Sequence, residues 1–196
     1  MPAMRARLVD RLGVSAPAVS QTVARLEREG YLVLDARNVM NLTEKGRDFA
    51  TSIMRRHRLA ERLLVDVLKV PWHQIHDEAC RLEHAISENL EQHLIALLGD
   101  PATCPHGNPI PGSANALPPR RLRALSSLGK GAQAIVRRID EELESSAARM
   151  LELETGRLVP GAQVSVESVG AQYSLLVDGL PQSFDRSVLE RIYVDA

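Results

Sequence analysis

The chain lacks an excess of charge of one sign, a long apolar run and a rich supply of cysteine. Its 24 basic and 25 acidic residues give a formal net charge of −1, so any nucleic-acid interface must be a local basic patch. No apolar run approaches the length of a membrane span and no signal-peptide pattern opens the chain. These absences predict a cytoplasmic protein with no membrane partner.

Cysteine is scarce enough to bear on the redox compartment. The chain has two cysteines, Cys80 and Cys104, which allow at most one disulfide. In a reducing cytoplasm Cys80 is a free thiol that a metal ion can recruit. The remaining composition is that of a folded globular protein, with 44% hydrophobic and 25% charged residues. A length of 196 residues suffices for one large domain or two to three small ones.

Side chains that can bind metal recur at helical spacing in two segments. Residues four apart share one face of an α-helix, which pairs His57 with Glu61 and Cys80 with both His76 and His84. Glu83 lies one turn past Cys80. Taken singly, a His-x-x-x-Glu pair is more often a solvated hydrogen bond, and a cysteine is more often buried packing. Together, imidazole, carboxylate and thiolate predict a site for a divalent transition ion.

The first fifty residues predict a helix-turn-helix followed by a hairpin. A helix from Met4 to Leu12 breaks at Gly13–Ala16, and Pro17 restarts a second helix. In the second helix the apolar positions Val19, Val23 and Leu26 point inward. Two short strands at 31–34 and 39–42 then form a wing. We therefore predict a winged helix-turn-helix domain over residues 1–51.

Residues 52–119 predict a helical domain. Thr43 caps a long helix that runs to about Lys69, and a second helix runs from about His76 to Leu98. The predicted inward positions of the first helix are Phe49, Ile53, Leu64 and Val67. The apolar face of the second comprises Ala85, Leu90, Leu94 and Leu97. Two long helices with more apolar surface than one of them can bury predict a homodimer, with packing inside a single chain as the alternative. A stretch rich in proline, glycine, asparagine and serine follows from 100 to 119.

Residues 120–196 predict a small β domain. Short β-rich segments occur at 134–136, 163–166, 173–177 and 189–194, with one helix around 142–154. This pattern fits an SH3-like barrel of the FeoA type. The predicted fold class is thus mostly α with a small β domain.

Four stretches in the same order carry a resemblance to a known family. They are Ser20–Arg25, His57–Leu64, His76–Cys80 with Glu83 and His84, and Gly107–Gly112. The chain resembles the diphtheria toxin repressor (DtxR/IdeR) family of iron-dependent transcriptional repressors over about residues 4 to 196. The resemblance implies a metal-dependent DNA-binding repressor that controls metal homeostasis genes and is not an enzyme.

The resemblance also implies two metal sites. The ancillary site matches His57, Glu61 and His76, completed by Glu141 and by Glu144 where the family has glutamine. Its anion contact falls on Arg58 and Asn108, with Cys104 in place of a serine. The regulatory site matches Cys80, Glu83 and His84. In the family a methionine from the first DNA-binding helix joins this site, and that helix has no counterpart here. We therefore expect an N-terminally truncated domain, through a misassigned start codon or a real truncation.

The implied partner is double-stranded DNA with a palindromic operator. Gln21 can contact a base edge, and Pro17 and Ala18 can contact a thymine methyl. The side chains expected to hold phosphates are Ser15, Ser20, Thr22, Arg25 and Arg28. The family implies Fe²⁺ as cofactor, with Mn²⁺, Co²⁺, Ni²⁺ or Zn²⁺ as alternatives, because ligand types alone do not select the ion.

Two other functions stay open from the sequence. One is a truncated metal-binding dimer without repressor activity. The other is a metalloenzyme, which is disfavoured because the His-Glu-x-x-His pattern of zinc proteases is absent. Gel shift with and without metal separates the three readings.

Overall fold

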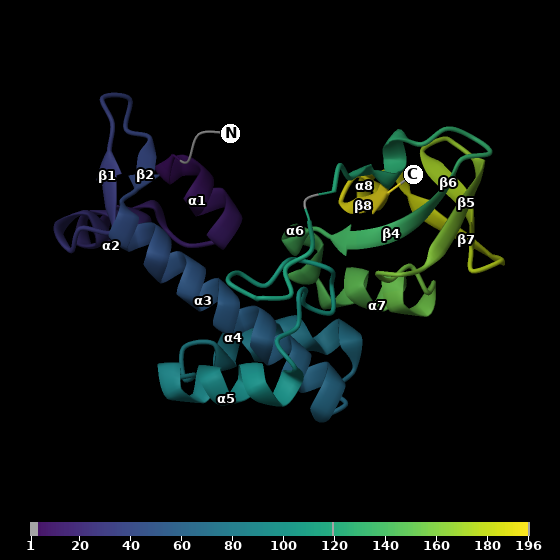
Figure 1. Ribbon diagram of the computed structural model, residues 1–196. Coiled ribbons are helices and arrows are strands. Elements are labelled where there is room, and N and C mark those ends of the chain that lie inside the picture. The colour runs from purple at the N-terminus through teal and green to yellow at the C-terminus, as the bar shows by residue number, and fades with distance from the viewer. Residues whose placement is uncertain (1–3, 119, 196) are drawn as a thin grey trace. The chain divides into compact units, whose positions relative to one another are not determined.

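The computed structural model describes residues 4–118 and 120–195, apart from the side chains of Ala6 and Arg11 (Figure 1). Residues 1–3 and 196, at the ends of the predicted outer domains, lie outside the described residues, as does Pro119 at the predicted boundary between the second and third domains. The chain divides into two compact units, Met1–Ile53 and Met54–Ala196. Among the described residues, no helix is both long and apolar enough to cross a membrane.

The helices are α1 (Arg5–Leu12), α2 (Ala16–Arg28), α3 (Glu44–Arg62), α4 (Ile75–Leu82), α5 (Glu88–Leu98), α6 (Glu141–Glu144), α7 (Ala147–Thr155) and α8 (Arg186–Leu189). The strands are β1 (Leu32–Leu34), β2 (Met40–Leu42), β3 (Arg123–Ala124), β4 (Gln133–Ile139), β5 (Gln163–Ser168), β6 (Gln172–Val177), β7 (Leu180–Asp185) and β8 (Ile192–Asp195).

The first unit contains α1, α2 and the antiparallel hairpin of β1 and β2, in the predicted order. The Ser15 hydroxyl caps α2 by accepting a hydrogen bond from the Ala18 amide. Val19 and Val23 point inward as predicted and form a small core with Leu32. The hairpin turn is held by the Asp35 carboxylate, which accepts bonds from two backbone amides of the turn at 2.8 and 2.9 Å.

Helix α3 begins as predicted and ends earlier. The Thr43 hydroxyl accepts a hydrogen bond from the Gly46 amide at 3.0 Å, which caps the helix. After Arg62 the α-helix gives way to a π-helical turn, Leu63–Val67. The predicted inward positions Phe49 and Val67 are wrong, since 52% and 46% of these residues are exposed. Helical spacing shows which apolar residues share one face of a helix, but these residues are buried only where another element packs against that face.

The second predicted helix is two helices. Helix α4 ends at Leu82, and α5 starts after Ser87, whose hydroxyl accepts a bond from the Leu90 amide at 3.2 Å. A serine that caps a new helix interrupts the old one, because its side chain competes for backbone donors. On the predicted apolar face Leu94 is buried, whereas Ala85, Leu90 and Leu97 are exposed.

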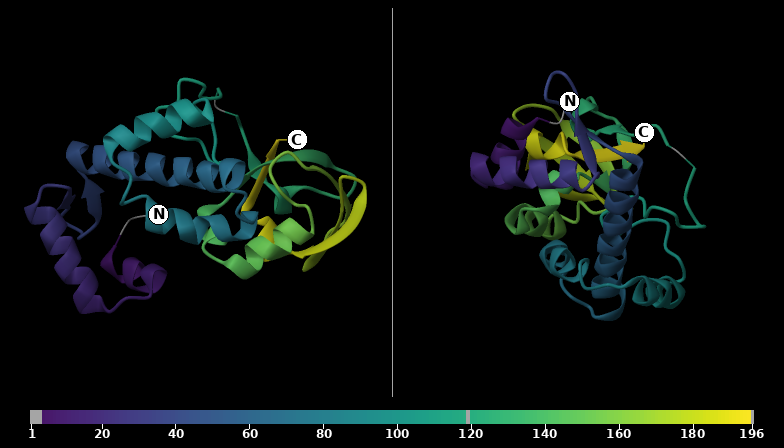
Figure 2. Two further views of the ribbon diagram at one scale, coloured as in Figure 1. Left: turned by 90° about the horizontal axis from the view of Figure 1, so that it is seen from below. Right: turned by 90° about the vertical axis from the view of Figure 1, so that its left-hand side faces the viewer.

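The C-terminal part of the second unit is a six-stranded antiparallel sheet with strand order β3-β8-β4-β5-β6-β7. The sheet is strongly curved (Figure 2). Its inner face, with α7, forms the largest core of the chain's described part, which includes Val136, Met150 and Ile192. The predicted helix at 142–154 is two short helices, because Ser146 caps α7 anew. The predicted strand at 189–194 starts only at Ile192, after α8.

Candidate metal centre and nucleic-acid surface

Four side chains from three helices converge inside the second unit. His57 and Glu61 lie one turn apart on α3, His76 lies on α4 and Glu144 ends α6. One ligand atom from each of the four residues lies within 4.8 Å of those of the others. Glu61 Oε1 is 3.2 Å from His57 Nε2 and 3.7 Å from His76 Nδ1. His76 Nδ1 is 3.4 Å from Glu144 Oε2.

The electrostatics of this cluster depend on buried carboxylates. Burial by itself would raise the pKa of Glu61, but the nearby imidazoles of His106, His57 and His76 outweigh it and hold the pKa well below its ordinary value. Burial would lower the pKa of His76, but Glu144 and Glu61 raise it to about 9. Imidazoles and carboxylates therefore neutralise one another in the metal-free protein.

The cluster fits a divalent cation. Glu61 Oε2 and His76 Nδ1 are buried without a hydrogen bond, and an unpaired polar atom in the interior costs about 1–3 kcal/mol. Ligands around a tetrahedral ion with bonds of about 2.0 Å stand about 3.3 Å apart. The donor atoms here already have comparable spacing, so an ion could be held with little rearrangement.

Of the two carboxylates predicted to complete this cluster, one joins it and the other does not. Glu144 joins it, whereas the Glu141 carboxylate pairs with the Arg58 guanidinium. Arg58 also donates to the backbone oxygen of Pro109. The Asn108 amide donates to Glu144 Oε1 at 2.7 Å and to a β4 carbonyl at 3.0 Å. Both predicted anion-contact residues thus bind carboxylates of the protein.

The predicted regulatory residues do not gather around one point. Cys80 Sγ lies 3.7 Å from His76 Nε2 and groups with His76 and His57. Glu83 Oε2 lies 2.7 Å from His57 Nδ1, and its other oxygen lies 3.3 Å from His84 Nε2. Within the described residues, no compact group of potential ligands unites Cys80, Glu83 and His84. Their assignment to one site stays a prediction.

The Cys80 thiol is protonated at neutral pH in the metal-free protein. Burial, and then the negative charge of the nearby Glu83 and Asp77 carboxylates, raise its pKa to about 11. A bound cation reverses this balance, because metal coordination deprotonates a thiol.

His106 was not among the residues predicted from the sequence, and Cys104 was named only as the residue that stands where the family has a serine. Both are buried in a loop of the second unit, and they form a group of potential ligands with Glu61. Burial would lower the pKa of His106, but Cys104, Glu144 and Glu61 raise it well above its ordinary value. The signal in the sequence was a cysteine and a histidine two residues apart, directly before Gly107 and Asn108.

The residues predicted to contact DNA share one property in the first unit: all are exposed. They are Ser15, Pro17, Ala18, Ser20, Gln21, Thr22, Arg25 and Arg28. They lie at the start of α2 or along it, and Val19 and Val23 of the same helix are buried. The helix therefore presents polar and basic groups to solvent, as a DNA-binding helix must.

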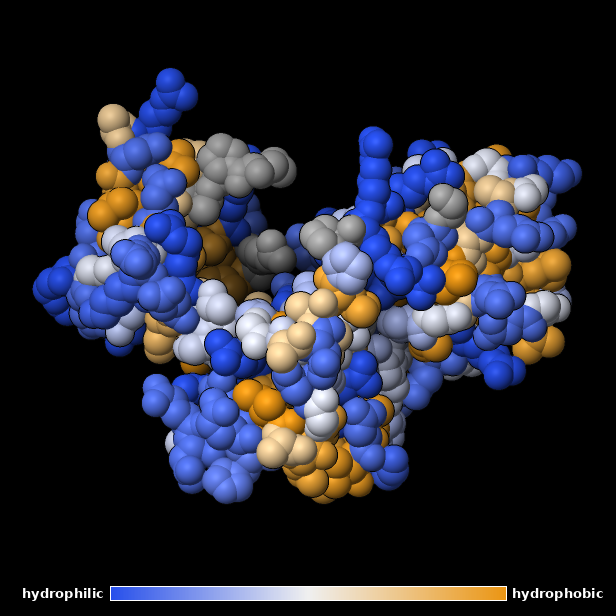
Figure 3. All heavy atoms as spheres, viewed as in Figure 1, coloured by the Kyte–Doolittle hydropathy of each residue, from blue (hydrophilic) through white to orange (hydrophobic). Residues whose placement is uncertain are grey.

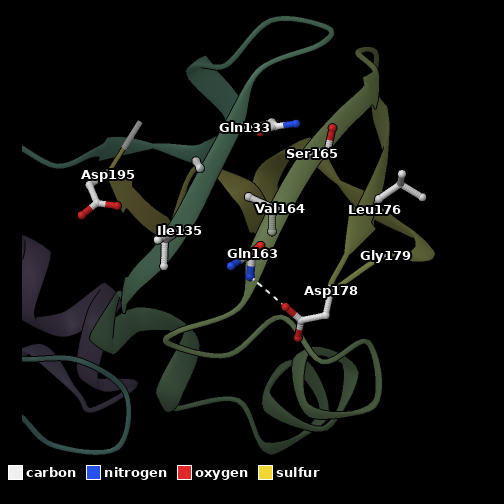
Figure 4. A pocket seen from close by; sticks show the side chains of 10 residues that line it. Gln133, Ile135, Gln163, Val164, Ser165, Leu176, Asp178, Gly179 and Asp195 are labelled. Atoms are coloured by element: carbon white, nitrogen blue, oxygen red, sulfur yellow. Dashed lines mark hydrogen bonds between the residues drawn. The ribbon is translucent and has the colours of Figure 1, made fainter.

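A separate groove lies on the sheet of the second unit (Figure 4). It is lined by residues of β4, β5 and β6 with the turn after β6, where Asp178 Oδ1 accepts a hydrogen bond from the Gln163 amide at 2.9 Å. Its other carboxylate, Asp195, is paired with Arg120 and Arg137 at 2.8 Å. The lining contributes no histidine or cysteine, so the groove lacks the chemistry of the metal cluster.

Comparison with known proteins agrees with this geometry. Residues 43–112 match the family model described as iron dependent repressor, metal binding and dimerisation domain. The chain is 41% identical over 190 residues to the iron-dependent repressor IdeR of Mycobacterium tuberculosis, covering 90% of this chain and 81% of that protein. The chain belongs to the iron-dependent repressor family. It is also 50% identical over 109 residues to the diphtheria toxin repressor of Corynebacterium diphtheriae, covering 56% of this chain and 48% of that protein.

The structural comparison extends over the full length. A solved structure titled manganese-dependent transcriptional repressor complex with manganese matches with a TM-score of 0.88 at 29% identity, covering 100% of this chain and 92% of that one. In this chain the matched family domain holds His57, Glu61, His76, Cys80 and His106, whereas Glu144 comes from beyond it.

Proposed function

We propose that this chain is a metal-dependent DNA-binding transcriptional repressor that controls metal homeostasis genes in the cytoplasm. The observation that carries the proposal is the buried cluster of His57, Glu61, His76 and Glu144, inside a chain that belongs to the iron-dependent repressor family. The cluster joins three helices that are far apart in the sequence. A bound divalent ion would supply positive charge that links them.

The proposed cofactor is Fe²⁺, with Mn²⁺, Co²⁺, Ni²⁺ or Zn²⁺ able to replace it in vitro. We assign the ancillary site to His57, Glu61, His76 and Glu144. Glu141 lies next to it, with Arg58 and Asn108 as anion contacts. We assign the regulatory site to Cys80, Glu83 and His84. The contact of Glu83 with His57 at 2.7 Å supports a link between the two sites through a shared neighbour.

We propose that residues 1–51 form a winged helix-turn-helix domain in which α2 enters the major groove. The exposed side chains of α2 support this orientation. Gln21 would contact a base edge, with Pro17 and Ala18 against a thymine methyl. Arg25 and Arg28, with the hydroxyl side chains Ser15, Ser20 and Thr22, would hold phosphates. The β1–β2 hairpin would serve as the wing.

We further propose a homodimer that binds a palindromic operator, formed through residues 52–119. Support comes from large apolar residues that are exposed in this unit, namely Val67, Leu68, Leu90 and Leu97. Figure 3 shows apolar residues gathered at the bottom of the view, in the region of α5. Exposed patches of this kind mark interaction sites. Residues 120–196, with their curved antiparallel sheet, would form an SH3-like domain.

The decisive experiment is selection of binding sites from a pool of random DNA duplexes, with Fe²⁺ under anaerobic conditions or with a chelator. We expect a palindromic sequence to be enriched only with metal. His76→Ala should reduce the enrichment, and His73→Ala should not, because His73 pairs with Glu154 and lies outside the groups of potential ligands. Enrichment that is equal with and without metal would contradict the proposal.

Cys80→Ala tests the regulatory assignment separately. Loss of a metal ligand should exceed the 10–100-fold effect of an outer partner, so this variant should fail to bind the selected operator at metal concentrations that saturate the unaltered protein. Operator binding by Cys80→Ala at an unchanged metal concentration would remove Cys80 from the site.

A further inference from the structure

A cavity of about 570 Å³ in the second unit is lined by four arginines, and none of the described residues that line it is acidic. It lies between the end of α3, the segment that joins α5 to β3, and the sheet. The arginines are Arg62 on α3, Arg120 before β3, and Arg137 and Arg138 on β4. A cleft lined by charge of one sign concentrates small ions of the opposite sign.

An irregularity in β4 brings two of these arginines to the same side of the sheet. Side chains of a strand normally alternate between its faces, and Ala134 and Val136 are buried in this alternating pattern. The pairing of β4 with β8 then shifts register between Val136 and Arg138. As a result Arg137 and Arg138 are both partly exposed, and burial resumes at Ile139. Such bulges re-aim side chains and are over-represented next to functional sites.

Three of the guanidinium groups are held in place by hydrogen bonds. Arg62 Nε donates to the Thr103 carbonyl oxygen at 2.7 Å. Arg120 Nη1 and Arg137 Nε both donate to Asp195 Oδ2, each at 2.8 Å. Two guanidinium groups that share one acceptor atom lie next to each other, so a further anion can contact both.

Arg138 is held by an aromatic ring instead of a carboxylate. Its guanidinium lies over the Tyr193 ring, 4.5 Å from the ring centroid. A guanidinium stacked on a ring keeps its N–H groups in its own plane, where they can meet an oxyanion. Within the described part of the chain, Arg138 has no ion pair.

The carboxylates that pair with these arginines do not balance their charge. Asp195 pairs with Arg120 and Arg137, and Asp66 Oδ2 lies 3.5 Å from Arg62 Nη1. Four guanidinium groups thus pair with two carboxylates, which leaves two positive charges uncompensated. Arginine keeps its charge at every physiological pH, so this excess is permanent.

The remaining lining of the cavity is mainly apolar. It includes Pro105, Pro118, Leu122, Val136 and Pro160. Ligand sites in proteins are typically clefts of about 300–1,000 Å³ with apolar walls and a few polar groups that fix the ligand. An inorganic ion would leave the apolar wall uncovered, whereas an anion with a carbon skeleton would cover it.

We propose that this cavity binds a small organic anion that carries two or more carboxylate or phosphate groups. Guanidinium groups bind both kinds of group through paired hydrogen bonds. The cavity is separate from the anion contact assigned to Arg58 and Asn108, because neither residue lines it. The proposal does not depend on metal or DNA binding.

The competing explanation is that the arginines only tie the neighbouring segments together through Asp195. In that case the chain has no affinity for organic anions, with or without the Asp195 charge. If a ligand does bind, Asp195 competes with it for Arg120 and Arg137, and removal of that charge strengthens binding. Asp195→Asn therefore distinguishes the two explanations.

The first test is isothermal titration calorimetry of the unaltered chain with tricarballylate, a tricarboxylate, and with the bisphosphate of fructose. Metal is removed with a chelating resin, because a soluble chelator such as EDTA is itself a polycarboxylate. We expect binding of one anion per chain with a Kd below about 1 mM at about 0.15 M NaCl. The tighter probe shows whether the site prefers carboxylate or phosphate groups. The absence of saturable binding by both probes would overturn the proposal, as would equally tight binding of inorganic phosphate.

Variants then locate the bound anion. Arg138→Gln should raise the Kd by about tenfold or more, because a hydrogen bond to a charged group is lost. Arg186→Gln is the matched control, since Arg186 is exposed, pairs with Glu190 and does not line the cavity. Asp195→Asn should lower the Kd by about threefold. Equal affinities of the Arg138→Gln and Arg186→Gln variants would place the anion elsewhere and refute the site.

Chemical modification gives the same decision on the unaltered chain, so the test does not depend on any variant folding. Phenylglyoxal reacts with guanidinium groups, and peptide mass spectrometry measures the rate at each arginine. A saturating concentration of the tighter probe should slow the modification of Arg120 and Arg138 and leave that of Arg186 unchanged. If the probe does not protect Arg138, the assignment of the cavity is wrong, whether or not the chain represses transcription.

Discussion

Glu61→Gln is expected to destabilise the metal-free protein strongly at pH 6 and only slightly at pH 10. Glu61 is completely buried, and its Oε1 atom lies 3.2 Å from both His57 Nε2 and His106 Nδ1. The carboxylate is ionised at both pH values, because its pKa is well below the ordinary value. The groups around Glu61 that titrate between pH 6 and pH 10 are the histidines.

The histidine pKa values explain why Glu61→Gln should destabilise the protein more at low pH than at high pH. The pKa of His76 is raised from 6.5 to about 9, and those of His57 and His106 are raised as well. A raised pKa stabilises the fold fully below pH 6.5, and this contribution is lost as pH rises through the folded value. For His76 alone the shift corresponds to at most about 3 kcal/mol. Breaking a buried ion pair costs about 3–5 kcal/mol, which we expect at pH 6, falling to about 1 kcal/mol at pH 10.

The assay is urea denaturation with a chelator present, at a series of pH values from 6 to 10. Glu91→Gln is the matched control: Glu91 is also buried, but it pairs with Arg56 at 2.9 Å and Arg55 at 3.3 Å. Arginine keeps its charge throughout this range, so the cost of Glu91→Gln should not depend on pH. If the two variants show the same pH profile, the histidines do not depend on Glu61 and the electrostatic account of the cluster is wrong.

Two further predictions concern the proposed interfaces. Gln21→Ala should weaken binding to the selected operator by about 1–3 kcal/mol with little change in salt dependence, whereas Arg25→Ala should weaken binding to all DNA and flatten the salt slope by about one unit. Fluorescence anisotropy over a salt series measures both, and an unchanged slope for Arg25→Ala would reverse the proposed orientation of α2. Leu97→Glu should convert the dimer to a monomer in sedimentation velocity while its circular dichroism stays unchanged, because 63% of Leu97 is exposed. If the Leu97→Glu variant dimerises with unchanged affinity, Leu97 does not belong to the dimer interface.

Local chemistry was readable from the sequence. Residues four apart on a helix share a face whatever the rest of the chain does, which is why the pairing of His57 with Glu61 was predicted and confirmed at 3.2 Å. The cap at Thr43 and the hairpin at 32–34 and 40–42 also depend on neighbours within a few residues. The four-stretch resemblance added the family, which the comparisons confirm.

Nonlocal contacts were decided only by the tertiary structure. The end of α6 brings Glu144 to α3 and α4 while Glu141 turns to Arg58, although both lie on the same four-residue helix. The exposure of Phe49 and Leu97 depends on which element packs against each face, and periodicity does not specify that partner. His106 reaches Glu61 because β4 anchors its loop through Ile139 and because Gly107 permits a close approach to Arg137. Such distances are set by the packing of segments far apart in the chain, so spacing in the sequence carries no record of them.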